Sequence, residues 1–169
     1  MFIFIPFEPA LERSSFDCGR PELDRWFREA AGQQERNNSA RTTLAVDERE
    51  ARIAGFFTLV VYRIEIDSVP EAMAGQGSRY PMSAVLLARL AVDRRYQGDG
   101  LGKIVLLEAL KRVADASRDI GFEVVVVDAL DEDAACFYLK HGFRRFTDHS
   151  LKLFMTTRNL RASFEADPD

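Results

Sequence analysis

The sequence predicts a mixed α/β fold: a single domain spanning residues 1–169, with a central sheet flanked by helices. Three observations predict it. The chain has 169 residues, the length of one ordinary domain. Strand patterns lie on both sides of two helical patterns. Two successive apolar strands in the second half are each followed directly by a helix, which indicates an α/β sheet rather than separate layers.

The first half of the chain predicts three strands and one helix. Phe2–Phe7 is a short apolar strand. A helix begins near Pro21, because proline suits the first helical position. Apolar residues from Leu23 to Ala31 then recur at helical spacing, and the polar stretch 33–40 ends the helix. Two strands follow, at Thr42–Val46 and Ile53–Ile66, around the charged turn 47–52.

The second half opens with residues 67–82, which are rich in Pro, Gly, Ser and Ala and predict a surface loop. The loop is long enough to be either a functional lid or a passive insertion. Val85–Val92 is a central strand that runs through RRYQGDGLGK into a helix. The remaining elements are that helix (Leu101–Ser117, closed by Gly121), a buried strand (Phe122–Asp128), a helix (Asp131–His141, capped by Gly142) and a hairpin (143–146 and 151–156).

Composition excludes several classes of protein. Hydrophobic residues make up 47% and charged residues 30%, which fits neither a disordered nor a fibrous chain. No stretch approaches the roughly 20 apolar residues of a membrane helix, and the first residues lack the basic flank of a signal peptide. We therefore expect a cytoplasmic protein with no membrane association. The net charge of −4 argues against a uniformly basic nucleic-acid-binding surface, although residues 89–118 hold seven Lys/Arg against four acids.

Cysteines and histidines give no sign of a metal site. Cys18 and Cys136 lie outside any CxxC motif, and we expect two free thiols. His141 and His149 have no carboxylate or thiol at metal-ligand spacing, so no metal is predicted.

The loop QGDGLG at 97–102 is the clearest functional signal. Its glycines let the backbone approach an anion, and the start of the following helix favours negative charge. The alternative is a merely flexible turn. A Walker loop fails, because Gln97 and Ile104 stand where Gly and Ser/Thr are needed. A dinucleotide fingerprint fails too, because Lys103 replaces its third glycine.

Two motifs carry a resemblance to a known family. The loop at 97–102 fits Q/R-x-x-G-x-G/A and resembles the acetyl-CoA loop of GNAT acetyltransferases. FYLKHGF at 137–143, about forty residues later and after a strand, resembles that family's FYxxxGF signature. FDCGRPELDRW at 16–26, LARLAVDRRYQGDGLG and VVDALDEDAACFYLKHGF further resemble the branch that acts as toxins of toxin-antitoxin modules.

The resemblance implies acetyl-CoA as acetyl donor and a set of residues that bind it. Backbone groups of Leu90, Ala91 and Val92 would hold the pantetheine arm, and the glycine loop would surround the pyrophosphate. Lys103 would add charge there, or is simply a solvated lysine. The full implied donor-binding set is Leu90, Ala91, Val92, Gln97, Gly98, Asp99, Gly100, Leu101, Gly102, Lys103 and Phe137.

Tyr138 is the candidate general acid. A phenol is protonated at neutral pH and can donate to the coenzyme A thiolate as it leaves. The alternative is a core aromatic that packs the end of the sheet. The strand 85–92 carries no Glu or Asp to act as a general base, and Asp128 and Asp131 are weak substitutes. Transfer through Cys136 is disfavoured, because the helical pattern puts this residue on the apolar side.

The missing base favours an α-amine as acceptor. An α-amine with pKa near 7.8 is partly neutral at pH 7.5, whereas lysine must spend roughly 4 kcal/mol to deprotonate. The toxin branch acetylates the α-amino group of aminoacyl-tRNA, and the resemblance implies a ribbon-helix-helix antitoxin and a homodimer. Alternatives are a small-molecule or protein amine, or a non-catalytic acyl-CoA module. The arginines expected to follow tRNA phosphates, or else to lie on a solvated face, are Arg36, Arg41, Arg89, Arg94 and Arg95.

Overall fold

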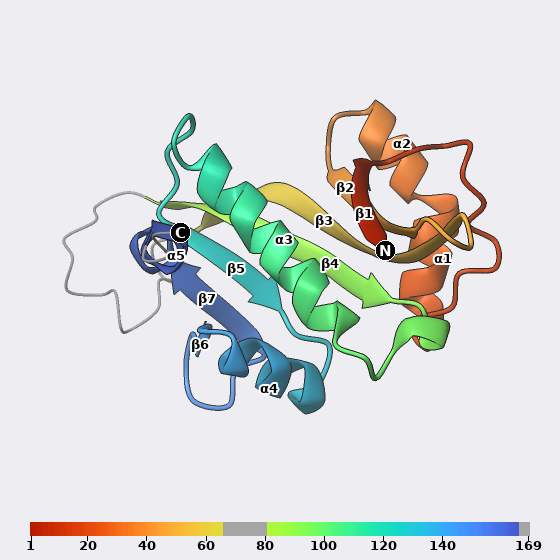
Figure 1. Cartoon of the computed structure of the whole chain (residues 1–169). Helices are drawn as coiled ribbons and strands as arrows, with labels where there is room; N and C mark the ends of the chain where they lie inside the picture. Colours follow the sequence, from red (N-terminus) through yellow and green to blue (C-terminus); the bar gives the residue numbers. More distant parts are fainter. Residues whose placement is uncertain (66–80, 166–169) are drawn as a thin grey trace. The chain divides into compact units, whose positions relative to one another are not determined.

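The computed structural model describes residues 1–65 and 81–165. Figure 1 shows its strands and helices. They are β1 (Phe2–Pro6), α1 (Pro21–Glu29), α2 (Ala31–Arg36), β2 (Arg41–Asp47), β3 (Arg52–Ile64), β4 (Met82–Val92), the 3-10 turn η3 (Arg94–Tyr96), α3 (Leu101–Ala116), β5 (Val124–Asp128), α4 (Glu132–Lys140), β6 (Arg144–Arg145), β7 (Lys152–Thr156) and α5 (Thr157–Glu165).

The strands form a mixed seven-stranded sheet in the order β1-β2-β3-β4-β5-β7-β6, so the predicted α/β fold is confirmed. The chain divides into two compact units. Unit 1 comprises Met1–Val60 and Ala88–Ala109, and unit 2 comprises Val61–Leu87 and Leu110–Asp169. The strands β3 and β4 and the helix α3 contribute residues to both.

Unit 1 is built on an antiparallel arrangement of β1, β2 and β3. β1 pairs along β2 from Phe2–Asp47 to Pro6–Thr43, and β2 pairs with β3 around a register shift at Ala45/Val46. Its core is aromatic. Phe27 of α1 stacks on Phe56 of β3 with 4.1 Å between ring centroids. α1 is therefore fixed to the sheet by stacked rings.

Unit 2 contains the parallel part of the sheet. β4 pairs with β5 from Ala84–Val124 to Leu87–Val127. β5 pairs antiparallel with β7, and β7 with the short β6. The four consecutive valines of β5 are all buried, as expected for a strand covered on both faces.

The predicted first helix differs from the structure in one respect. The sequence predicts one helix up to Ala31, but the chain turns at Ala30, whose φ is −114°, and a second helix follows. The polar stretch 33–40 was predicted to end the helix, but its first residues belong to α2. The Glu35 carboxylate accepts a hydrogen bond from the Thr42 backbone N–H at 3.0 Å. The polar residues of α2 therefore attach it to β2.

Other predicted boundaries shift at the ends of elements. Gly121 does not close α3, which ends at Ala116; a turn follows in which the Ile120 N–H donates to the Ala116 carbonyl. β4 begins at Met82, inside the predicted loop 67–82, of which all but Pro81 and Met82 lies outside the described residues. α5 and η3 were not predicted.

Local capping signals are confirmed where they were strongest. Pro21 occupies the start of α1. The Asp131 carboxylate caps α4 by accepting from the Ala134 N–H at 2.8 Å, and Gly142 follows its end with φ of +95°. Within the described residues, no helix is long and apolar enough to cross a bilayer.

Candidate functional site

The end of β4 is the first part of the site. The register between β4 and β5 ends at Leu87–Val127, so Leu90, Ala91 and Val92 lie beyond the last pair. On the other side, a Cβ at Gly55 would lie 2.8 Å from the Ala91 carbonyl oxygen, closer than any side chain tolerates. Gly55 thus lets β3 approach the strand whose backbone was predicted to hold the pantetheine arm.

The glycine loop follows within the same unit. Gly98 and Gly100 have φ of +92° and +85°, in the left-handed region that favours glycine. A Cβ at either position would meet no atom within 4 Å, so conformation rather than space requires glycine. α3 begins at Leu101, and its first-turn N–H groups have no acceptor within the helix. The loop therefore places free backbone donors where an anion is favoured.

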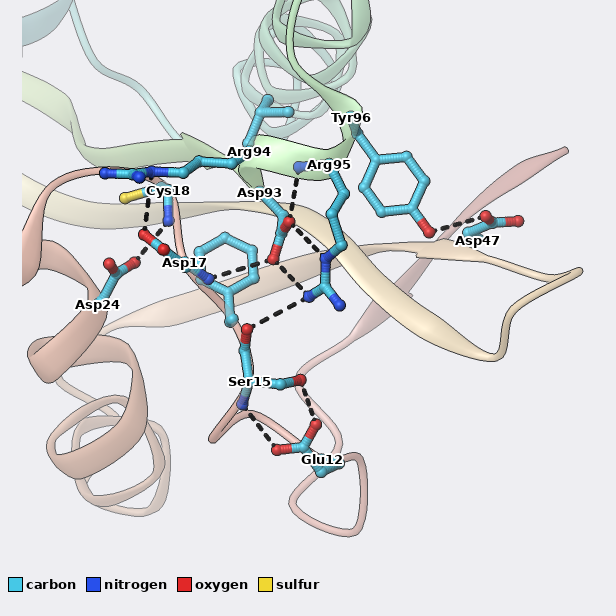
Figure 2. A network of polar contacts seen from close by, with 12 residues as sticks. Glu12, Ser15, Asp17, Cys18, Asp24, Asp47, Asp93, Arg94, Arg95 and Tyr96 are labelled. Carbon is cyan, nitrogen blue, oxygen red and sulfur yellow. Dashed lines mark hydrogen bonds and ion pairs between the residues drawn. The ribbon is translucent and has the colours of Figure 1, made fainter.

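A buried carboxylate anchors the segment that precedes this loop. Figure 2 shows Asp93 between Asp17 and Arg95. Asp93 is 1% exposed. It accepts hydrogen bonds from the backbone N–H of Asp17 at 3.1 Å and of Arg95 at 2.9 Å. The Arg95 guanidinium donates to both carboxylate oxygens, at 2.9 and 2.8 Å. It also reaches the Ser15 carbonyl at 3.2 Å, which ties residues 15–17 to the end of β4.

The charge of Asp93 is stabilised by these contacts. Burial alone would raise the pKa of Asp93, but the hydrogen bonds from Arg95 and from the two backbone N–H groups outweigh it and lower the pKa. Asp93 raises the pKa of Arg95 in turn, chiefly through their side-chain hydrogen bond. The pair stays ionised at neutral pH.

Gln97 adds a second connection. Its side-chain amide donates to the carbonyl of Cys18 at 3.0 Å and to that of Val92 at 2.8 Å. The Gln97 side chain, which was predicted to help surround the pyrophosphate, therefore forms its hydrogen bonds within the protein instead. The Gln97 backbone N–H is engaged as well, because it donates to the Arg94 carbonyl at 3.3 Å.

Residues 17–24 complete the anchor. The Asp24 carboxylate, which is 5% exposed, accepts from the Cys18 N–H at 2.9 Å. Burial, with a smaller contribution from Asp24, raises the pKa of the Cys18 thiol to about 12, so this thiol is not a nucleophile at neutral pH. Both cysteines are free, as predicted.

Sequence reasoning missed this anchor. Asp17, Asp24 and Asp93 were not singled out, and Arg95 was expected to face tRNA. One signal was available: Asp93 is an acid placed directly between an apolar strand and a glycine loop. Asp17 lies 76 residues from Asp93, and Ser15 lies 80 residues from Arg95, where local patterns carry no information.

Tyr138 lies in unit 2, on α4. Its ring is 7% exposed and makes edge contacts with Phe137 at 5.2 Å and Phe143 at 5.6 Å between centroids. Burial raises the pKa of Tyr138. The hydroxyl is thus protonated throughout the neutral range and can serve only as a proton donor there. The structure shows the aromatic packing that was the alternative interpretation, and the role of Tyr138 as a proton donor stays a prediction.

The remaining candidate groups of unit 2, Asp131, Asp128 and Cys136, have three different environments. Asp131 is used as the cap of α4. Asp128 lies 4.0 Å from the Lys152 ammonium. Cys136, expected on the apolar side of its helix, is exposed, because it falls between the buried positions Ala135 and Tyr138. In the described part of the chain, no group of three His, Cys, Asp or Glu could hold a metal ion.

Four of the five arginines proposed to follow phosphates have partners within the protein. Arg95 binds Asp93, and Arg94 lies 3.4 Å from the Asp17 carboxylate. Arg41 pairs with Glu35 and Asn38. The Arg89 guanidinium lies 3.8 Å from the centroid of the Trp26 ring. Among the described residues, Arg89 is the one of these four arginines whose partner is an aromatic ring rather than an oxygen atom.

An open hollow of about 280 Å³ also lies in unit 1. Its lining residues are Leu11, Glu12, Arg13, Ser14 and Arg28. None of the predicted donor-binding residues lines it, so we place the site at the glycine loop, where the backbone geometry suits an anion.

Known proteins share this sequence pattern. A family model described as "Acetyltransferase (GNAT) domain" matches residues 38–145. A Mycobacterium tuberculosis protein named tRNA-acetylating toxin is 31% identical over 149 residues, which cover 88% of this chain and 88% of that protein.

Solved structures of the toxin AtaT share the fold. AtaT complexed with acetyl-methionyl-tRNAfMet has a TM-score of 0.86 at 25% identity, covering 97% of this chain and 99% of that one. AtaTR bound with AcCoA has a TM-score of 0.85 at 26% identity, covering 96% and 98%. A tyrosine-to-phenylalanine mutant of AtaT bound to the C-terminus of the antitoxin AtaR has a TM-score of 0.83 at 25% identity, covering 96% and 98%.

Proposed function

The chain belongs to the family of GNAT acetyltransferase domains, and from this premise we propose that it transfers the acetyl group of acetyl-CoA to the α-amino group of aminoacyl-tRNA. The observation that carries the proposal is the glycine loop at the start of α3, whose backbone donors suit a pyrophosphate. We further propose that residues 1–169 act as one acetyltransferase domain.

The donor is held mainly by backbone. Leu90, Ala91 and Val92, beyond the last β4–β5 pair, offer strand N–H and carbonyl groups to the amide-containing pantetheine arm, as an added strand would. Residues 97–103 surround the pyrophosphate, and the exposed Lys103 adds a positive charge. The hydrogen bonds of Asp93 to Arg95 and of Gln97 to Val92 hold the loop in the conformation that the pyrophosphate needs. Phe137 completes the donor-binding set from α4.

The reaction needs one proton donor and one neutral amine. The amine nitrogen attacks the acetyl carbonyl carbon, the carbon–sulfur bond breaks, and the amine releases a proton to solvent. Tyr138 donates its hydroxyl proton to the departing thiolate. A phenol is protonated at neutral pH, so the proton is present when the thiolate leaves, and the tyrosine regains a proton from solvent after product release.

Both amine chemistry and the relatives support an α-amine of aminoacyl-tRNA as the acceptor. An α-amine has enough neutral form at cellular pH to react without a strong base, and no acid on β4 supplies one. A relative is named tRNA-acetylating toxin, and AtaT was solved with acetyl-methionyl-tRNAfMet. Such an acceptor places the protein in the cytoplasm.

The biological role follows from the same relatives. We propose a toxin that is restrained by a small antitoxin of the ribbon-helix-helix type, as AtaT was solved bound to the C-terminus of AtaR. We also propose a homodimer. A neighbouring gene for a small DNA-binding protein and a solution mass of two chains are the observations that test these two points.

The direct test is acetyl transfer from labelled acetyl-CoA. Charged tRNA, uncharged tRNA, amines and peptides serve as parallel acceptors. We expect label on charged tRNA alone. Label on an amine or peptide and none on tRNA would replace the acceptor with a small-molecule or protein amine. Binding of acetyl-CoA without any transfer would favour a non-catalytic acyl-CoA module.

A growth assay tests the toxin role. Expression of the wild type should stop growth of a bacterial host, and Tyr138→Phe should restore it. Equal toxicity of the two proteins would refute the mechanism, because it would separate toxicity from acetyl transfer.

A further inference from the structure

Arg89 of β4 has an unusual environment in unit 1. Its guanidinium carbon lies 3.8 Å from the centroid of the Trp26 ring on α1. Trp26 stacks in turn on Phe56, with 6.1 Å between ring centroids and 29° between planes, and Phe56 stacks on Phe27. The arginine therefore rests on a rigid aromatic column. A cation held over an indole in this way is attracted by the ring but keeps its N–H donors at the guanidinium edge.

This cation has no negative partner within the described residues, where no carboxylate forms an ion pair with it. Arg89 is half-buried, and burial lowers the pKa of its guanidinium. Because a partly desolvated charge is costly unless it is paired, the fold holds Arg89 at a cost that an incoming anion would relieve. Trp26 is uncharged, so it cannot neutralise Arg89. Its own ring N–H is buried without a hydrogen-bond partner among the described residues.

The position of Arg89 connects it to the proposed reaction. It immediately precedes Leu90, the first of the three residues proposed to hold the acetyl donor, so their Cα atoms are about 3.8 Å apart. Alternate residues of a strand share a face, and Ala91 belongs to the core cluster against which Trp26 packs. Arg89 therefore projects from the α1 side of the strand that carries the donor. An acceptor that brings its amine to the donor from this side passes the guanidinium.

We infer that Arg89, supported by Trp26, binds a phosphate at the 3′ end of the aminoacyl-tRNA. This inference rests on the proposed function. The α-amine of an aminoacyl-tRNA is joined through an ester to the last ribose, and the phosphate of that nucleotide is the anion nearest to the reacting amine. A planar guanidinium offers the paired donors that phosphate accepts. Arg89 is thus a residue that selects a nucleotide-linked amine over a free one.

The experiment compares two acceptors that share one amino acid: the aminoacyl-tRNA and the methyl ester, which has no phosphate. Arg89→Met keeps an unbranched apolar chain on Trp26 and removes the charge, Arg89→Lys keeps the charge, and Arg158→Met is a control at an exposed arginine of α5. For Arg89→Met we expect KM for aminoacyl-tRNA to rise about 10- to 100-fold, with kcat and the methyl-ester reaction little changed. The slope of log KM against log salt should fall by about 0.7. Arg89→Lys should restore most of that slope.

Binding without chemistry gives a separate measurement. Trp26 is the single tryptophan, so its emission reports on this position alone. Uncharged tRNA should change the emission of the wild type and of Arg158→Met, and about tenfold or more tRNA should be needed for Arg89→Met. If wild-type protein fails to acetylate charged tRNA, the proposed function is wrong, and the titration still tests Arg89.

Three results would overturn the inference. The first is an equal loss on aminoacyl-tRNA and methyl ester, which would mean that Arg89 acts on the amine or the fold. The second is a tRNA affinity and salt slope that Arg89→Met leaves unchanged. The third is an emission change produced by an acidic peptide, lost in Arg89→Met, with none produced by tRNA, which would make Arg89 part of a protein interface.

Discussion

The glycine loop of unit 1 and Tyr138 of unit 2 are built in opposite ways. Around the loop, polar side chains such as Asp93 and Gln97 bond inward to the protein, and the proposed ligand contacts fall to the backbone. Around Tyr138, packing is aromatic, and the proposed chemistry depends on one side-chain hydroxyl. From this difference we expect substitutions around the loop to change acetyl-CoA affinity, because they alter the conformation of the loop. Substitution of Tyr138 should change turnover alone.

The largest expected effect separates the two regions most sharply. Tyr138→Phe removes the proton donor and leaves the ring in its aromatic frame, so kcat should fall by about 10²- to 10⁴-fold while acetyl-CoA affinity changes little. Single-turnover kinetics and calorimetric titration with acetyl-CoA measure the two quantities. Tyr62→Phe, which removes a hydroxyl that accepts from Lys152 in the same unit, is the matched control and should keep its turnover. Equal kcat for all three proteins would break the comparison.

The second effect is on the folded state of the loop. Asp93→Ala leaves the Arg95 guanidinium and two backbone N–H groups without their acceptor, at a cost of about 3 kcal/mol in the free energy of unfolding. Acetyl-CoA affinity should fall with it. Urea unfolding measures the loss, and Asp119→Ala, at an exposed position after α3, should cost less than about 0.5 kcal/mol. A stable variant that binds acetyl-CoA normally would show that the anchor is dispensable.

Acidification sharpens the same point. Because the folded pKa of Asp93 lies below its unfolded value near 4, its contribution to stability is present above pH 4 and is lost as pH falls through the folded pKa. The wild type should therefore lose more stability between pH 5 and pH 2.5 than Asp93→Asn does, as measured by the urea midpoint at each pH. Parallel curves would assign the acid sensitivity to other carboxylates.

The smallest effect concerns Gln97. Gln97→Ala removes two hydrogen bonds from an exposed side chain, so acetyl-CoA affinity should weaken about 5- to 10-fold with little change in kcat. Gln97→Glu should be worse, since a carboxylate cannot donate to the Cys18 and Val92 carbonyls and adds negative charge beside the pyrophosphate. Gln33→Ala, an exposed glutamine of α2, is the control. If Gln97→Glu binds acetyl-CoA better than Gln97→Ala does, the inward hydrogen bonds of Gln97 do not shape the loop and position 97 does not lie beside the pyrophosphate, because a carboxylate can neither donate to the two carbonyls nor favour a nearby anion.

Sequence patterns predicted the parts of this molecule that depend on neighbours in the chain. The position of Pro21 at the start of α1 is a local property, and this prediction is confirmed. The cap at Asp131 and the positive φ of Gly98 and Gly100 are also local properties, found at residues that the sequence analysis had singled out for other reasons. The family motifs point to the proposed site for the same reason, since each is a short run of residues. Gly121 was misread because glycine also occurs in ordinary turns.

What sequence could not predict depends on residues far apart. α2 looked polar and loop-like because its Glu35 contact to Thr42 is a tertiary one. The engaged amide of Gln97 and the buried pair of Asp93 and Arg95 are likewise invisible in any short window. Arg41, Arg94 and Arg95 were expected to contact a nucleic acid, but each pairs with a carboxylate of the protein. Only the three-dimensional arrangement distinguishes Arg89 from them.

The separation of these partners along the chain also sets the order in which the molecule can be made. Ser15, Asp17 and Cys18 meet their partners 80, 76 and 79 residues later. During synthesis, the amino-terminal segment therefore emerges long before anything exists to hold it. A ribosome that stops before residue 93 releases a fragment without an organised donor loop, and such a fragment cannot carry out the proposed reaction. Under the proposed function, activity then arrives late in the protein's own synthesis.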